Sequence, residues 1–457
     1  MPSLRDPNLR DPSLCDPSLC DPSLCDPSLR DPSLRDPSLR DPSLRDPSLG
    51  NLNLRDPRLD FFRGLAMFII LIAHVTDNPW NLWMPGRFGF SDATEVFVFC
   101  SGMASALAFG PVFARAGFGL GTLRIACRVW QVYWVHIAVF LCGLLAMLVI
   151  DRTGAFPDKE VAALNLDRFL SDTGPNVIGL MTLTYVPNYF DVLPMYLVIL
   201  ALVPPVIALS RLHPVLAMGA SVALWLVAGL GAINLPAEWW FIEGSTRPWF
   251  FNPFAWQVVF FTGFALMSGW LPAPPVNRVG VAGAVVVLLL SVPFAWQPVI
   301  DRSPVVQAWR ADWVMLFDKT TFGILRCVHF LSVAYLAWIA AGPGGARLKQ
   351  VGVWSGVVAV VSRVGTQSLA VFAASMVLAR ILGAVLDLTG RGFLPTLAIN
   401  LAGFALIVAV AELATVIKRQ PWRSTDRVPP ADAPVSSNVH PNAAIRTTAP
   451  HGKKAQA

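Results

Sequence analysis

Arg63 and His74 lie eleven residues apart in the first long apolar segment of this 457-residue chain. Eleven residues of α-helix return almost to the starting angle, so both side chains share one face, roughly 16 Å apart along the helix axis. Ionisable side chains are costly inside a bilayer and by default mark a functional site there. We therefore predict that Arg63, Met67, Ile70 and His74 form a stripe that faces the protein interior.

His74 is the first candidate for chemistry in this stripe. Neutral imidazole titrates near physiological pH and can accept the proton of an attacking hydroxyl, so His74 could act as a general base. A hydrogen bond between helices is the alternative role for such a histidine. Arg63 could orient the site from below, and its alternative role is a cationic anchor at the membrane boundary.

Two carboxylates open the second apolar segment three residues apart, Asp92 and Glu95. They share a helix face on the same side of the membrane as His74. Glu95, about one turn deeper, could fix the histidine tautomer as the acid of a catalytic triad does. Asp92 is a candidate for substrate binding, although an acid is also favoured there by the helix dipole. Ser101 and Gly102 predict close helix packing.

The composition is that of a membrane protein. Hydrophobic residues make up 54% and charged residues 14%, with a mean hydropathy of +0.55. A bilayer core requires about 20 apolar residues per spanning helix. Ten such segments are predicted, near 60–78, 93–114, 124–150, 191–210, 214–233, 254–270, 279–297, 321–341, 363–386 and 394–417. The expected fold is an all-α bundle, with no support for nucleic-acid binding beyond the basic pI.

Charge orients these segments. The connections at 115–128, 211–213, 271–278 and 342–363 contain Arg and Lys but no Asp or Glu, whereas the alternate connections are acidic. Basic loops remain in the cytoplasm, so both termini are predicted to be cytoplasmic and the acidic loops periplasmic or exterior. His74 then lies in the outer half of the membrane, and Arg63 lies near its inner boundary.

The third segment and its approach supply further candidates. Tyr133 and His136 lie on adjacent faces of one helix and could contact a substrate, with hydrogen bonding in the core as the alternative. Arg124 and Arg128 belong to the densest inner basic cluster, which could meet the phosphates of a cytoplasmic donor. Their topogenic role would be a sufficient explanation as well.

The two ends of the chain differ from the membrane domain. Residues 1–54 repeat Asp-Pro every five positions, which forbids a continuous helix and offers little apolar surface, so this extension is predicted to be disordered. Its cysteines lack the partners of a metal site, and no compact ligand set is present elsewhere. Residues 419–457 are predicted to form a disordered cytoplasmic tail, which leaves 55–418 as the membrane domain.

Several motifs in this domain resemble the OpgC family. They are residues 55–66 (Arg-Asp-Pro-Arg-Leu-Asp-Phe-Phe-Arg-Gly-Leu-Ala) with His74, residues 87–99 with Ser101 and Gly102, and residues 189–196, 251–257 and 365–372. The family consists of inner-membrane succinyltransferases of osmoregulated periplasmic glucans, related to membrane acyltransferases with an Arg-x10-His motif in the first helix. One departure is Ala73, since relatives often have an acidic residue before the histidine.

The resemblance implies a multi-pass protein of the bacterial inner membrane that transfers an acyl group, with succinyl-CoA as co-substrate and no bound cofactor. A periplasmic glucan or similar glycan would be the acceptor, and the glucan-synthesis machinery is a possible partner. His74, Glu95 and Arg63 would be the catalytic residues. A transporter of a carboxylate or glycan that uses the buried Arg and His is the alternative, and a scaffold that has lost activity is the third.

Overall fold

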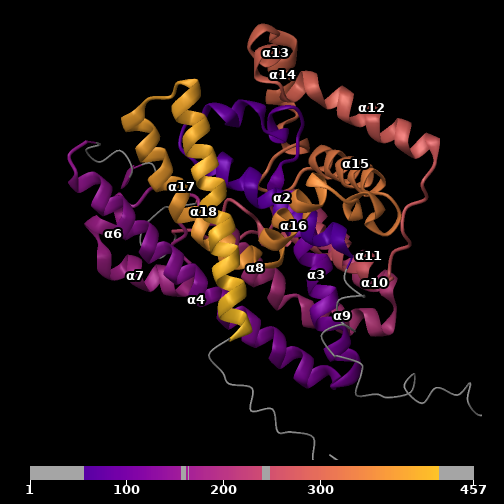
Figure 1. The fold of residues 1–457 in the computed structure, drawn as a ribbon. Coiled ribbons are helices and arrows are strands. Elements are labelled where there is room, and N and C mark those ends of the chain that lie inside the picture. The colour runs from indigo at the N-terminus through magenta and orange to yellow at the C-terminus, as the bar shows by residue number, and fades with distance from the viewer. Residues whose placement is uncertain (1–55, 156–160, 163, 239–246, 421–457) are drawn as a thin grey trace, which may run out of the picture.

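The computed structural model describes residues 56–420 except 156–160, 163 and 239–246. The predicted N-terminal repeat and nearly all of the predicted tail lie outside the described residues. Every regular element in the described part is a helix, and no β-strand occurs among these residues (Figure 1). The all-α prediction is therefore confirmed.

Seven of the described segments are long and apolar enough to cross a membrane, so the chain is a multi-pass membrane protein. They are α3 (Ala93–Arg115), α4 (Gly117–Arg152), α8 with α9 (Val192–Ala201 and Val203–Leu212), α12 (Arg278–Ala295), α15 (Ile324–Ala341), α17 (Ser368–Thr389) and α18 (Phe393–Arg419). The predicted count of ten is not confirmed, and neither is the predicted orientation of the termini.

The other three predicted segments are helical but fall short of these criteria. Helix α2 (Pro57–His74) has the necessary length but carries Arg58, Asp60 and Arg63 in its first two turns. Helices α10 (Pro214–Gly229) and α11 (Pro253–Met267) have only 16 and 15 residues. A further apolar helix, α16 (Val353–Thr366), was not predicted as a separate element.

Helix α2 is central in the bundle and packs against α3, α16 and α17. Asp56 caps its N-terminus by accepting a hydrogen bond from the Arg58 amide (3.0 Å), and Pro57 occupies the first turn, where proline fits best. Met67 and Ile70 are 0% and 5% exposed, which confirms that the predicted stripe faces inward.

Glycines allow the central helices to approach closely. A Cβ on Gly64 of α2 would lie 1.9 Å from the carbonyl oxygen of Val361 in α16. The same is true of Gly102 in α3, where the added atom would lie 1.9 Å from the carbonyl oxygen of Phe260 in α11. The predicted role of Gly102 in helix packing is confirmed.

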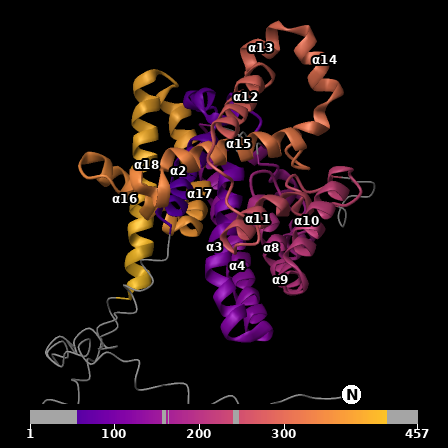
Figure 2. The same cartoon turned by 90° about the vertical axis from the view of Figure 1, so that its right-hand side faces the viewer.

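The remaining helices surround this centre. Helix α4 packs against α3, α8 and α17, and α17 packs against α18. Helix α12 contacts α15 and lies at the right-hand edge of the molecule in Figure 1, the side that faces the viewer in Figure 2. Short helices complete the connections: η8 (Pro79–Trp83), η9 (Pro85–Arg87), α6 (Asp167–Ser171), α7 (Thr173–Thr182), α13 (Gln297–Arg302), α14 (Pro304–Asp312), η10 (Val314–Leu316) and η11 (Pro343–Lys349).

Candidate active site

A cavity of about 850 Å³ lies where the ends of several helices meet. Its walls come from the last turns of α2, the first residues of α3 and α8, the segment before α11 and the segment before α15. By the charge pattern of the loops, all of these ends belong to the side predicted to face outward. The ionisable lining residues are His74, Arg87, Asp92, Asp191, Arg247 and Lys319, and the aromatic ones are Tyr189, Trp249, Phe250 and Phe251.

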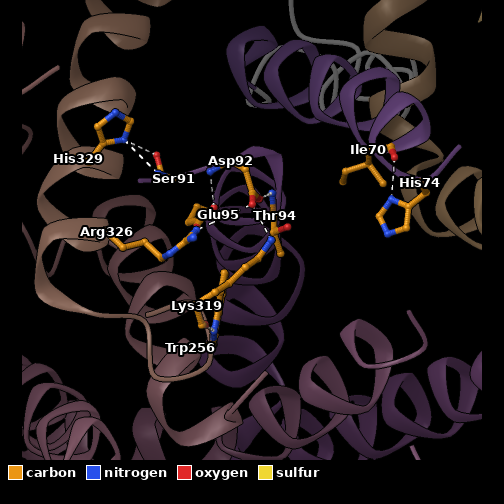
Figure 3. A network of polar contacts seen from close by, with 10 residues as sticks. All are labelled: Ile70, His74, Ser91, Asp92, Thr94, Glu95, Trp256, Lys319, Arg326 and His329. Carbon is orange, nitrogen blue, oxygen red and sulfur yellow. Dashed lines mark hydrogen bonds and ion pairs between the residues drawn. The ribbon is translucent and has the colours of Figure 1, made fainter. Parts of the chain in front are cut away.

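His74 ends α2 and is half-buried in this wall. Its Nδ1 lies 2.7 Å from the carbonyl oxygen of Ile70, one turn earlier in the same helix (Figure 3). A carbonyl oxygen only accepts hydrogen bonds, so Nδ1 must carry the proton and Nε2 keeps its lone pair. This backbone contact fixes the tautomer that a general base at Nε2 requires.

The structure pairs Glu95, which was predicted to orient His74, with an arginine of α15. The Glu95 carboxylate is fully buried and lies 2.5 Å from Nη1 of Arg326 in α15. The same carboxylate accepts a hydrogen bond from the Asp92 amide (2.8 Å), which completes a capping box at the start of α3. Figure 3 shows this cluster apart from the His74 ring. Glu95 therefore anchors α3 to α15, and Ile70 fixes the histidine instead.

Asp92 faces the cavity from the same cluster. Nζ of Lys319 lies 2.6 Å from its carboxylate, and Nη1 of Arg326 lies 3.9 Å away. Burial alone would raise the pKa of Asp92, but the charges of Lys319 and Arg326 outweigh it and hold the pKa below its usual value. Asp92 is therefore an ionised carboxylate at neutral pH, and Lys319 brings a cation to the same wall.

A buried histidine positions the loop that leads to Asp92. Nδ1 of His329 lies 2.7 Å from the Ser91 hydroxyl and accepts a hydrogen bond from the Ser91 amide (3.3 Å). Because Nδ1 accepts from the amide, the Ser91 hydroxyl donates to it as well. Gly89 is needed in this loop, since a Cβ there would lie 1.9 Å from Nε2 of His329.

The opposite wall combines a carboxylate, a cation and aromatic rings. Asp191 is only 7% exposed and lines the cavity just before α8. Arg247 donates to the carbonyl oxygen of Val186 (2.7 Å) and pairs with Glu238 (2.9 Å). Tyr189 adopts a φ of +70°, a conformation that bulky residues rarely tolerate outside functional or tightly held sites.

Tyr189 is sandwiched between two charged or titratable groups. Its ring lies 5.6 Å from the His74 ring in an edge-on arrangement. The guanidinium carbon of Arg380, on α17, lies over the Tyr189 ring, 4.0 Å from its centroid. Arg380 also donates to the hydroxyl of Thr76 (3.1 Å), in the turn that follows His74.

The structure brings together two of the eight predicted site residues, His74 and Asp92, in the cavity wall. Glu95 lies behind Asp92. The other five do not line this cavity. Arg63 lies nearer the opposite end of α2, and Tyr133 donates to the carbonyl oxygen of Met181 (2.8 Å) on the flank of α4. His136 is buried within α4, and Arg124 and Arg128 belong to its early turns, before Tyr133.

Sequence reasoning did not select Lys319, Asp191, Arg247 or Arg380. Asp191 had a signal, because it lies in one of the motifs that carry the family resemblance. Arg380 had another, since a single arginine in an otherwise apolar spanning segment is a functional hypothesis by default. Lys319 and Arg247 had none, because loop cations are common and only the tertiary structure brings them to the cavity.

The described residues include no cluster of three or more His, Cys, Asp or Glu side chains that could hold a metal ion. The arrangement instead offers a fixed histidine base, paired carboxylates and cations, and aromatic surfaces. Such a set suits proton transfer beside a polar, sugar-like substrate.

Comparison with known proteins agrees with the resemblance drawn from the motifs. The family model described as OpgC protein matches residues 55–419, which include every helix from α2 to α18. No curated protein and no solved structure matches the chain. The family match covers well over half of the sequence and all of the residues that line the cavity. The chain therefore belongs to the OpgC family, a family of glucan-modifying membrane acyltransferases.

Proposed function

We propose that this protein transfers a succinyl group from succinyl-CoA to a hydroxyl of a periplasmic glucan in the bacterial inner membrane. The observation that carries the proposal is the fixed tautomer of His74, whose Nδ1 is bound by the Ile70 carbonyl in the wall of a large polar and aromatic cavity. The family match supports acyl transfer, and the chemistry of the cavity supports a polar acceptor.

In the proposed reaction the acceptor hydroxyl binds in the cavity next to His74. Nε2 removes the hydroxyl proton while the oxygen attacks the thioester carbonyl, and the carbon–sulfur bond then breaks to release the CoA thiol, which regains a proton from the imidazolium. A new ester joins the succinyl group to the glucan. Lys319 lines the same cavity, and its ammonium group stabilises the negative oxygen of the tetrahedral intermediate.

The acceptor would occupy the wider part of the cavity. Trp249, Phe250 and Phe251 offer apolar faces against which sugar rings can pack, and the carboxylates of Asp92 and Asp191 can accept hydrogen bonds from sugar hydroxyls. The thioester would approach from the cytoplasm between helices. Arg124 and Arg128, in the early turns of α4 next to a basic connection, are the proposed contacts of its phosphates.

The test is the succinyl content of periplasmic glucans in a strain that lacks its own enzyme. The strain is complemented with wild type, His74→Ala or His213→Ala at matched membrane levels, and the glucans are separated by charge and weighed by mass spectrometry. His213 is exposed at the start of α10 and serves as the control histidine. We expect wild type and His213→Ala to restore anionic glucans and His74→Ala to lower the transfer rate by roughly 10²- to 10⁴-fold.

Other results would change the proposal. If wild type leaves the glucans neutral, the acceptor assignment is wrong, and transport of a carboxylate or glycan becomes the better explanation. If His74→Ala restores succinylation as well as wild type does, the enzyme assignment stands but His74 is not its base.

A further inference from the structure

The geometry points to Arg380 as the binding site for the free carboxylate of the transferred acyl group, and so as the residue that selects a dicarboxylic acyl donor. This inference rests on the proposed function and adds to it the basis of acyl selectivity. It starts from a buried cation that lacks a carboxylate.

Arg380 lies within the spanning helix α17 and is only 4% exposed. Among the described residues it has two contacts, the hydrogen bond from Nη1 to the Thr76 hydroxyl and the stacking on Tyr189. Nη2 is buried without any hydrogen-bond partner in the described part of the chain. A buried guanidinium without an anion is expensive, so its retention requires a reason.

The neighbouring cations differ from Arg380 because carboxylates of this chain already neutralise them. Lys319 pairs with Asp92, Arg326 with Glu95 and Arg247 with Glu238. Arg391, just after the end of α17, pairs with Asp387 in the last turn of that helix. Arg87 lines the cavity as well, but it is exposed, so water solvates its charge. Among these described cations around the cavity, Arg380 is therefore the buried one that no carboxylate neutralises.

The position of Arg380 suits a ligand that reacts beside His74. Tyr189 separates the two residues, with its ring 5.6 Å from the His74 ring and 4.0 Å from the guanidinium carbon. A succinyl group has its free carboxylate three carbon atoms from the reacting carbonyl, so an acyl group placed at His74 can extend past this ring to Arg380. An uncharged acyl group of equal length offers nothing to the guanidinium.

The stacking on Tyr189 and the proposed carboxylate contact involve different parts of the guanidinium. Tyr189 covers the face of the guanidinium, whereas carboxylates bind its N–H edge. The Tyr189 side chain belongs to a residue that is 43% exposed, so its ring can turn to admit the acyl chain. The backbone of Tyr189, with φ at +70°, fixes the position of the residue in the wall and leaves its side-chain torsions free to change.

The experiment compares two donors that differ only at the far end, succinyl-CoA and butyryl-CoA, with purified neutral glucan as acceptor and the full chain in detergent. For wild type and each variant, kcat/KM is measured for both donors. We expect Arg380→Gln to lower the succinyl-to-butyryl ratio by roughly 10- to 100-fold, the scale of a lost charge-assisted pair. Arg380→Lys, which keeps the charge without the fork, should give an intermediate ratio.

Arg391→Gln is the matched control. Arg391 contacts the same turn, by donating to the Thr76 carbonyl oxygen (2.9 Å), but Asp387 already neutralises it. Arg391→Gln should change kcat/KM for both donors by the same factor and leave the succinyl-to-butyryl ratio at the wild-type value. A second readout covers variants with low activity: succinate, but not butyrate, should raise the Tm of wild type and of Arg391→Gln, and this shift should be absent in Arg380→Gln.

The outcomes separate this inference from the proposed function. If wild type prefers succinyl-CoA and Arg380→Gln keeps the wild-type ratio, Arg380 does not bind the carboxylate. The inference is then wrong, and the proposed function is unaffected. If Arg380→Gln and Arg391→Gln each lower kcat/KM for succinyl-CoA and butyryl-CoA by equal factors, Arg380 only supports the fold. If wild type itself shows no preference for succinyl-CoA, the assignment of the donor fails first.

Discussion

At the scale of single residues, the site depends on pairs of opposite charge that keep each other ionised. Asp92 is the clearest case, since burial would raise its pKa and the charges of Lys319 and Arg326 more than compensate. A carboxylate whose pKa is lower in the folded protein stabilises the fold at pH values above its ordinary pKa of 3.8, and this contribution is lost as the pH falls through the lower, folded pKa.

Lys319→Met should therefore change the pH dependence of stability. Without the ammonium group 2.6 Å from the carboxylate, burial raises the pKa of Asp92, and the acid loss of stability moves upward by roughly one pH unit or more. The measurement is Tm against pH between 3 and 7 in detergent, for wild type, Lys319→Met and the charge-preserving control Lys319→Arg. If the profiles of wild type and Lys319→Met superimpose, Asp92 does not depend on this ion pair.

At the scale of elements, glycines determine how close the central helices come. Gly102 faces the backbone of Phe260 across the α3–α11 contact, and a Cβ at Gly102 would lie 1.9 Å from its oxygen. Gly219 lies inside α10, and a Cβ there meets nothing within 4 Å. The two positions therefore separate packing from helix propensity.

Gly102→Ala should destabilise the protein by about 1–3 kcal/mol, because the backbone atom opposite cannot move aside as a flexible side chain can. Gly219→Ala should instead be neutral or stabilise by up to about 1 kcal/mol, since alanine favours the helix. Thermal unfolding of both variants in detergent, with the elution profile as a check of folding, distinguishes the two. Equal Tm values would show that α3 and α11 adjust their separation freely.

The elements were more predictable than their meeting point. Hydrophobic segments and the eleven-residue spacing correctly predicted helices and an inward stripe along α2, because both depend on local periodicity. The partner of His74 was not predictable in this way. The sequence placed Glu95 at the right depth, but the choice between His74 and Arg326 depends on how α15 docks against α3, which no local pattern encodes.

The same limit explains the three segments that fall short as spanning helices. Helices α10 and α11 were recognised as apolar, but α10 ends at Gly229, and α11 begins only after the Asn252 cap and ends at Met267, so each is shorter than the predicted segment. Arg380 is the opposite case, because an arginine in an apolar helix is already a signal in the sequence. Only the structure shows that no carboxylate lies beside it in the described part of the chain.

At the scale of the whole molecule, the cavity and the basic connections lie at opposite ends of the helices. The cavity is built from the end of α2 and the starts of α3 and α8, whereas the connections at 115–128 and 342–363 join the other ends. A smaller pocket of about 370 Å³ lies at that other end, between α2, α15 and α16. Acyl transfer to a periplasmic acceptor requires the larger cavity to face outward.

This orientation can be tested with single cysteines in a background that lacks the native ones. Val305, in α14, is 78% exposed on the side of the acidic loops, and Val351, before α16, is 97% exposed on the basic side. Basic loops remain inside, so a membrane-impermeant maleimide added to intact spheroplasts should label Val305→Cys and not Val351→Cys. Permeabilised cells, in which both should react, provide the control. The reverse pattern would place the cavity in the cytoplasm, where His74 could not act on a periplasmic glucan and the transfer would have to precede export of its acceptor.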